Sequence, residues 1–237
     1  MLAVLINAVA VLFGGLIGSL FGNRIPEKYT KGIMLSISLV TIGIGVQSIL
    51  QTQNILIVVL CIVAGTILGT ALKLDERINN AADSVKRKLS GTKIGQGPFA
   101  EAFVTTSILF CVGTMTVIGS IQAGLNRDYS ILLTKSVMDF FSSIAFSAAL
   151  GPGVFFSALT VIVIQGALVL LAGVAAPLMS EQVVAEMSAV GGLLFLGMAI
   201  NLLGLREEKI KVGDMLPGIF LPILYFPLAQ WITGLFT

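Results

Sequence analysis

The sequence contains no histidine and only two cysteines, Cys61 and Cys111, each inside an apolar segment. Zinc sites and disulfide frameworks are assembled from sets of these two residue types, so the chain is expected to hold neither. Charge is scarce as well, at 11% of the residues, against roughly 25% in ordinary globular domains. A chain with so few charged residues is not expected to form a soluble domain.

Apolar residues, by contrast, are abundant. They make up 56% of the chain, and the mean hydropathy is +1.01. A length of 237 residues leaves room for about seven to nine membrane-spanning helices and for no separate soluble domain. We therefore expect an all-α, polytopic membrane protein with one transmembrane domain over residues 1–237. The opening helix lacks a positive start and a cleavage site, so we expect it to be retained.

Long apolar runs predict where the chain crosses the membrane. Eight such runs are present, at residues 2–22, 32–50, 54–72, 99–124, 129–150, 154–177, 188–205 and 215–236. Two joints between them, QTQN near residue 51 and Gly151-Pro152-Gly153, are short enough to form only helical hairpins. The sequence thus predicts about eight transmembrane helices.

The basic residues set the expected orientation, because cytoplasmic loops are enriched in lysine and arginine. With the N-terminus outside, the inner loops hold 12 of the 14 basic residues, while Arg127 falls on an outer loop and Lys135 within a span. This asymmetry predicts a protein of the cytoplasmic membrane with both termini on the extracytoplasmic side. The basic residues of the inner loops are Arg24, Lys28, Lys31, Lys73, Arg77, Lys86, Arg87, Lys88, Lys93, Arg206, Lys209 and Lys211.

The longest inner loop has apolar residues at helical spacing, among them Leu74, Ile78 and Val85. In the helix that this spacing predicts, acidic residues occupy the first turn and basic residues lie at the end. Gly91 follows as a residue that typically ends a helix. We expect a cytoplasmic amphipathic helix over residues 74–90 that lies on the anionic inner leaflet. Binding of a partner protein is the alternative.

Glycines recur at intervals of four in the first and third spans, as Gly14, Gly18 and Gly22 and as Gly65 and Gly69. Such spacing leaves a face of bare backbone that another helix can approach closely. Packing within one bundle and assembly of a homodimer both use this arrangement, so a homodimer stays open.

The fifth span carries a lysine and an aspartate, Lys135 and Asp139, one helical turn apart on a single face. Lys135 lies about six residues, or roughly 9 Å, from the outer end of its helix. A charge inside a bilayer costs a few kcal/mol, so such residues are functional candidates that face a wet cavity or the bundle interior. The alternative is an ion pair that serves structure alone.

Other polar side chains fall at a similar depth. Asn7 is on the first span and Gln165 on the sixth, and their amides need partners in an apolar environment. We expect four spans to line one outward-facing polar cavity around the ion pair. The remaining candidates are Thr116 and Ser120 on the fourth span and Ser143 on the fifth.

Two further features are typical of secondary transporters. The last span contains Pro217, Pro222 and Pro227, so it must be kinked or broken, although a kink that fits the helix into the bundle is the commoner explanation. The sequences of spans one to three can also be aligned with those of spans six to eight, which places Asn7 near Gln165 in the alignment. Because five spans separate the copies, the repeat would be inverted in the membrane.

Long segments of the chain are similar to a known family. They are INAVAVLFGGLIGSLFG near the start, FCVGTMTVIGSIQAGL at 110–125, TKSVMDFFSSIAFSAALGPGVFFSALTVIVIQG at 134–166, and EMSAVGGLLFLGMAINLLGLREEKIKVGDMLPGIFLPIL at 186–224. Over essentially its whole length the chain resembles the bacterial multi-pass membrane proteins classed as domain of unknown function 554. The resemblance implies an inner-membrane protein and supplies no substrate. It places Lys135, Asp139, Gln165, Glu186 and Asn201 in recognisable blocks, which adds Glu186 and Asn201 as candidates.

These features favour a secondary transporter or channel for a small polar or ionic solute. Asp139 would bind a cation or proton, and Lys135 would be its counter-charge or an anion contact. The alternative is a non-transporting scaffold or sensor that acts through residues 74–90. No cofactor or metal site is expected, and an enzyme is disfavoured because the loops hold neither a phosphate-binding motif nor a nucleophile elbow. Nucleic-acid binding is not expected, since topology explains the basic loops.

Overall fold

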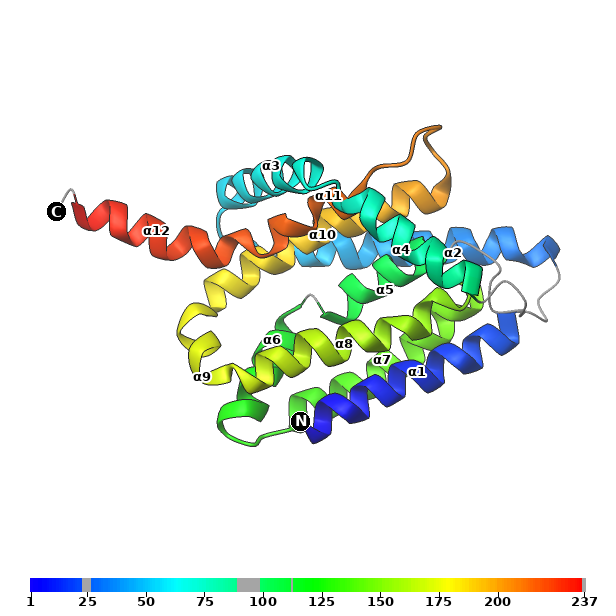
Figure 1. The fold of residues 1–237 in the computed structure, drawn as a ribbon, viewed down its shortest axis with the longest axis horizontal. Coiled ribbons are helices and arrows are strands. Elements are labelled where there is room, and N and C mark those ends of the chain that lie inside the picture. The colour runs from blue at the N-terminus through cyan, green and yellow to red at the C-terminus, as the bar shows by residue number, and fades with distance from the viewer. Residues whose placement is uncertain (23–26, 89–98, 112, 236–237) are drawn as a thin grey trace.

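The computed structural model describes residues 1–22, 27–88, 99–111 and 113–235, and its elements within these ranges are all helices. The all-α expectation is therefore confirmed (Figure 1). In chain order the elements are α1 (Leu2–Gly22), α2 (Glu27–Ile49), α3 (Ile55–Ala71), α4 (Leu74–Lys88), α5 (Phe99–Cys111), α6 (Thr114–Leu125), α7 (Ser130–Leu150), α8 (Gly153–Leu170), α9 (Ala172–Ala175), η2 (Ala176–Leu178), α10 (Glu181–Leu203), α11 (Val212–Met215), η3 (Leu216–Ile219) and α12 (Leu221–Leu235).

Among the described residues, four helices are long and apolar enough to cross a membrane, namely α1, α7, α8 and α10. The number rises to six if each of two bent pairs, α3 with α4 and α5 with α6, counts as one span. Two shorter apolar helices, Leu35–Ile49 and Val212–Leu228, coincide with the remaining apolar runs. The structure thus supports a polytopic membrane protein, while the count of eight spans stays a prediction.

The fourth expected span is not one straight helix. Helices α5 and α6 are inclined by 55° to each other, and Gly113 at the start of α6 has φ +153°. Glycine reaches this backbone conformation without the steric cost that other residues would meet. A continuous apolar run therefore hides a break that depends on backbone geometry rather than on hydropathy.

Two other expected boundaries were wrong. Helix α10, which is the seventh expected span, begins at Glu181 instead of near residue 188. Ser180 caps it by accepting a hydrogen bond from the Val183 N–H group. The acidic residues in the first turns of α10 made the predicted apolar run begin too late. Helix α8, which is the sixth expected span, ends at Leu170 rather than near residue 177, and the chain continues through the short helices α9 and η2.

The last apolar segment is broken, as its prolines predicted. Pro217 lies in the 3₁₀ helix η3, which separates α11 from α12. Pro222 stands in the first turn of α12, where a missing N–H group costs least, and Pro227 lies inside that helix.

The helices form two groups (Figure 1), and clusters of buried apolar residues lie within both of them. In the first group, α1 packs along α7 and α8, and α5 and α6 pack on α8. In the second, α10 packs along α2, and α3 packs on η3 and α11. The core of the first group includes Val11, Phe146 and Val161, and that of the second includes Val58 and Leu194.

The glycine face of the first span is occupied within the chain. A Cβ atom added at Gly14, Gly18 or Gly22 would collide with backbone oxygens of α7. The face on the third span is filled too, because Gly65 lies against Gly218 in the same way. These glycines therefore serve packing within one chain. Whether the protein also forms a homodimer stays a prediction.

Segments paired in the predicted repeat lie against each other. Helix α1 contacts α8, α2 contacts α10, and α3 contacts η3 and α11. Contact between equivalent helices is compatible with a two-fold axis in the membrane plane. The repeat itself stays a prediction.

Two of the predicted inner loops meet in the structure. Asp214 Oδ1 accepts a hydrogen bond of 2.9 Å from the Asp75 N–H group, and Asp75 Oδ1 accepts one of 2.9 Å from the Gly213 N–H group. This reciprocal pair joins the start of α4 to the segment that follows α10. Both therefore lie on one side of the helices, as the distribution of basic residues requires. Which side faces the cytoplasm stays a prediction.

Candidate functional site

The charged pair of α7 is enclosed by the first group of helices. Lys135 Nζ lies 2.5 Å from Asp139 Oδ2, and each residue is only 6% exposed. Their spacing of one helical turn brings both side chains to the same face of α7. The two charges therefore neutralise each other inside the protein.

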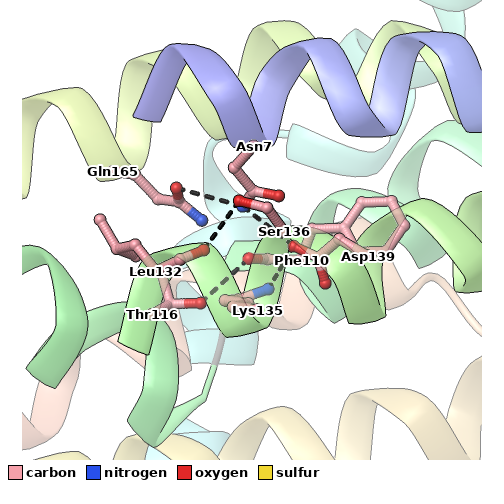
Figure 2. Close-up of polar contacts among 8 residues, drawn as sticks. All are labelled: Asn7, Phe110, Thr116, Leu132, Lys135, Ser136, Asp139 and Gln165. Atoms are coloured by element: carbon pink, nitrogen blue, oxygen red, sulfur yellow. Dashed lines mark hydrogen bonds and ion pairs between the residues drawn. The ribbon is translucent and has the colours of Figure 1, made fainter. Parts of the chain in front are cut away.

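Two amide side chains extend this pair, as expected from the sequence. Asn7 Nδ2 on α1 donates one hydrogen bond of 3.0 Å to Asp139 Oδ2 and another of 3.2 Å to Gln165 Oε1 on α8. Figure 2 shows these side chains converging from three helices. Asn7 and Gln165 have no exposed surface. We call Asn7, Lys135, Asp139 and Gln165 the polar network.

The polar network leaves some of its own atoms unpaired. Asn7 Oδ1 and Gln165 Nε2 are buried and have no hydrogen-bond partner among the described residues, and outside the network the same is true of Ser120 Oγ on α6 and Ser188 Oγ on α10. A buried polar group without a partner costs about 1–3 kcal/mol. These atoms are consequently the ones that a bound molecule or water would satisfy.

Thr116, another predicted site residue, lies beside the polar network but bonds elsewhere. Its hydroxyl donates to the backbone oxygen of Phe110 at 3.0 Å, across the break between α5 and α6. The Phe110 ring lies over Lys135, with the ring centroid 5.8 Å from Nζ. This distance is suited to a cation–π contact. Thr116 thus stabilises the break that positions the Phe110 ring.

The expected outward-facing cavity around the charged pair does not coincide with either of two prominent cavities formed by described residues. These have volumes of about 370 Å³ and 190 Å³, and neither is lined by Lys135 or Asp139. The pair is closed off because Phe110 covers Lys135 and because the glycines of α1 let that helix pack tightly on α7. The charged pair is therefore enclosed by its neighbours in this structure.

Like Thr116 and Ser120, three further predicted site residues do not join the polar network. Ser143 is buried but faces α1 at Gly14, and its hydroxyl donates to the Phe140 oxygen of its own helix at 2.8 Å. Asn201 pairs with the backbone of Ile210, donating at 2.9 Å and accepting at 2.8 Å. Both contacts position backbone segments.

The third, Glu186 on α10, is buried in the second group of helices and binds the turn between α2 and α3. One carboxylate oxygen accepts from the Thr52 hydroxyl at 2.6 Å. The other accepts from the N–H groups of Gln53 at 2.9 Å and Asn54 at 3.0 Å. The carboxylate lies at the N-terminus of α3, where a negative charge is favourable.

Sequence reasoning missed several residues that shape the molecule. Phe110 looked like one more apolar residue, and its place over Lys135 depends on the break at Gly113. Asp214 is 5% exposed and holds α4. Its position just before the first proline of the last span was the one signal that could have found it.

The sequence was compared with known proteins. The family model described as "Protein of unknown function (DUF554)" matches residues 2–227. "Uncharacterized protein YqgA" of Escherichia coli (strain K12) is 31% identical over 229 residues, which cover 95% of each chain. "Uncharacterized membrane protein YdfK" of Bacillus subtilis (strain 168) is 26% identical over 226 residues, which cover 94% of each chain. No solved structure matches. The chain is thus a member of the DUF554 family, over nearly its whole length.

Proposed function

We propose that this protein is a secondary transporter or channel for a small polar or ionic solute, with Lys135 and Asp139 at the solute site. The observation that carries the proposal is the pair of unpartnered amide atoms, Asn7 Oδ1 and Gln165 Nε2, next to a buried ion pair. A network that served structure alone would gain stability by pairing every atom or by being replaced with apolar side chains.

The unpaired atoms indicate what the site can hold. Asn7 Oδ1 can only accept a hydrogen bond and Gln165 Nε2 can only donate one. The Lys135 ammonium carries three hydrogens and makes one hydrogen bond among the described residues, to Asp139. A solute with at least one donor and one acceptor would therefore pair with groups that are otherwise unsatisfied.

The charge of the site restricts the solute further. Lys135 and Asp139 are neutral as a pair, and an uncompensated charge inside the bilayer costs a few kcal/mol. A neutral or zwitterionic solute keeps the closed site neutral. A cation or an anion would leave an uncompensated charge in the closed site. Transport of a charged solute is therefore expected to be coupled to the movement of a second, compensating ion.

Passage through the closed site requires helices to move. Interrupted helices are where secondary transporters commonly open and bind their solutes. In this chain the break between α5 and α6 at Gly113 lies beside the polar network, because Phe110 precedes it and covers Lys135. Straightening or rotation at this break would uncover the ammonium group.

The test is flux in reconstituted vesicles that contain a pH-sensitive dye, with gradients of sodium, potassium, chloride or alanine. Asp139→Asn should abolish any flux that the unaltered protein supports, after correction for the amount of folded protein. Asp128→Asn, in the loop before α7 and bonded to Ser130, is the matched control and should leave flux unchanged. Undiminished flux in Asp139→Asn would remove this residue from the mechanism.

A scaffold or sensor role through residues 74–90 is the second candidate. It is supported by the observed helix α4, which carries acidic residues in its first turn and whose described residues include the exposed Arg77; residues 89–90 lie outside the described part of the chain. Deleting the whole segment would also remove Asp75, which bonds Gly213. Replacing Lys86, Arg87 and Lys88 with glutamine is therefore the cleaner test. Loss of complementation in cells by this triple variant, with vesicle flux retained, would favour the second candidate.

A further inference from the structure

The larger cavity, of about 370 Å³, lies away from the polar network, between α4, α5, α10 and residues 209–213. Small-molecule sites usually enclose about 300–1,000 Å³. None of the four residues of the polar network lines it. What occupies this cavity is thus a separate question from solute transport.

Charged side chains of both signs surround the cavity. Glu101 on α5 forms an ion pair with Lys209, and Asp75 and Lys211 also contribute to the lining. Lys211 has no hydrogen bond or ion pair with any described residue. The side chain of Lys209 is 66% exposed and that of Glu101 is 24% exposed, so a molecule from solution can reach the ion pair.

The interior of the cavity offers one more polar group. Thr105 is 1% exposed and lines the cavity. It stands one helical turn after Glu101, so both side chains lie on the same face of α5. A buried hydroxyl, a reachable carboxylate and a reachable ammonium group therefore border the same space.

The other polar residues of the lining are held by hydrogen bonds. The Asp75 carboxylate accepts from the Gly213 N–H group and from Asn79 Nδ2, and Asn201 makes both of its amide hydrogen bonds to Ile210. These contacts fix the segment with Lys209 and Lys211 against α4 and α10. The cavity is thus bounded by pre-positioned elements, which reduces the ordering cost of binding.

We propose that this cavity binds a small zwitterion, with its ammonium group at Glu101 and Asp75 and its anionic group at Lys209 and Lys211. A ligand with a single charge would meet two residues of its own sign. A zwitterion replaces the exposed Glu101–Lys209 contact with two contacts of the same kind and leaves the net charge unchanged. The Thr105 hydroxyl is available to hydrogen-bond the part of the ligand that enters deepest.

The ligand chemistry is tested on purified, delipidated protein by calorimetric titration with glycerophosphoethanolamine and with alanine, both zwitterions. Ethanolamine supplies the cation alone and glycerophosphoglycerol the anion alone. At least one zwitterion should bind about tenfold more tightly than either singly charged compound. Equal affinities, or failure of both zwitterions to bind at millimolar concentration, would overturn the proposal.

Variants locate the binding. Lys211→Gln removes a charge that has no partner among the described residues, so folding should be unaffected, and zwitterion affinity should fall about tenfold. Glu101→Gln should weaken zwitterion binding similarly. Arg206→Gln and Glu207→Gln change exposed residues of the same loop that do not line the cavity, and they should bind as the unaltered protein does. If all four variants bind alike, the cavity is not the site.

The same zwitterion chemistry occurs in a free solute and in a phospholipid headgroup, and reconstitution distinguishes them. Phosphatidylethanolamine in the vesicles should block binding of glycerophosphoethanolamine if the headgroup of a lipid fills the cavity. Vesicles of phosphatidylglycerol alone are the control. Equal binding in both kinds of vesicle would assign the cavity to a free solute.

Discussion

The two groups of helices each bury a carboxylate, and their surroundings differ. Glu186 in the second group accepts hydrogen bonds from one hydroxyl and two backbone N–H groups. Asp139 in the first group accepts from Lys135 and Asn7, and the network around it leaves an amide oxygen and an amide nitrogen unpaired. Burial alone therefore does not mark a functional acid. A saturated carboxylate holds a turn in place, whereas one in an unsatisfied network can exchange partners.

The largest effect is expected from breaking the charged pair on one side only. Asp139→Asn leaves the Lys135 ammonium buried without a counter-charge. Lys135→Gln likewise leaves the Asp139 carboxylate buried without a counter-charge. Each should lower the free energy of unfolding by about 3–5 kcal/mol. The double variant Lys135→Gln/Asp139→Asn has no buried charge and should lose less than about 1 kcal/mol. Denaturant unfolding in detergent measures all three, and equal losses would show that the two charges are not coupled.

Glu186→Gln comes next, because it sharpens the contrast with Asp139. The amide oxygen can keep the N–H groups of Gln53 and Asn54, but the Thr52 hydroxyl loses the carboxylate oxygen to which it donates, and every bond to the turn loses its charge. The free energy of unfolding should fall by about 1–3 kcal/mol. Flux per folded molecule should stay unchanged. A variant that unfolds normally but has lost flux would move Glu186 from a structural to a functional role.

A smaller effect is expected at the interface that closes the site. Gly18→Ala places a Cβ against the Ile144 backbone oxygen of α7 and should cost about 1–3 kcal/mol. Gly43→Ala is the control, because a Cβ there meets no atom within 4 Å. Thermal unfolding of both variants decides between them. An unaffected Gly18→Ala protein would mean that α1 does not pack closely on α7.

Gln165→Leu should change stability least and still lower flux. It removes an unpaired amide nitrogen along with an acceptor of the Asn7 amide, and an apolar side chain of similar size costs about 1 kcal/mol or less here. If the network exists to bind solute, flux should drop at least tenfold, since about 1.4 kcal/mol of lost binding corresponds to this factor. Retained flux would leave Gln165 as a packing residue.

Much of this arrangement could be predicted from single segments. Apolar runs located the helices, and the spacing of Lys135 and Asp139 alone predicted their contact. The break at Gly113 could not be predicted in this way, because hydropathy does not report backbone conformation. The start of α10 was missed since its acidic residues interrupt the apolar pattern, although Ser180 is a recognisable cap.

Contacts between distant segments were harder to predict. The convergence of Asn7 and Gln165 was expected from their depth in their spans, and the structure joins them directly. The partners of Glu186 and Asn201 are backbone groups, which carry no sequence signature. For these two residues the sequence indicated a polar group worth examining but not its task.

We propose that the two charges of α7 serve solute transport in addition to the stability of the helix bundle. The most direct measurement is solute flux through vesicles that contain the folded double variant Lys135→Gln/Asp139→Asn, compared at equal protein amount with the unaltered protein. We expect the double variant to have near-normal stability and to have lost flux. Normal flux through this uncharged variant would contradict a transport role for Lys135 and Asp139.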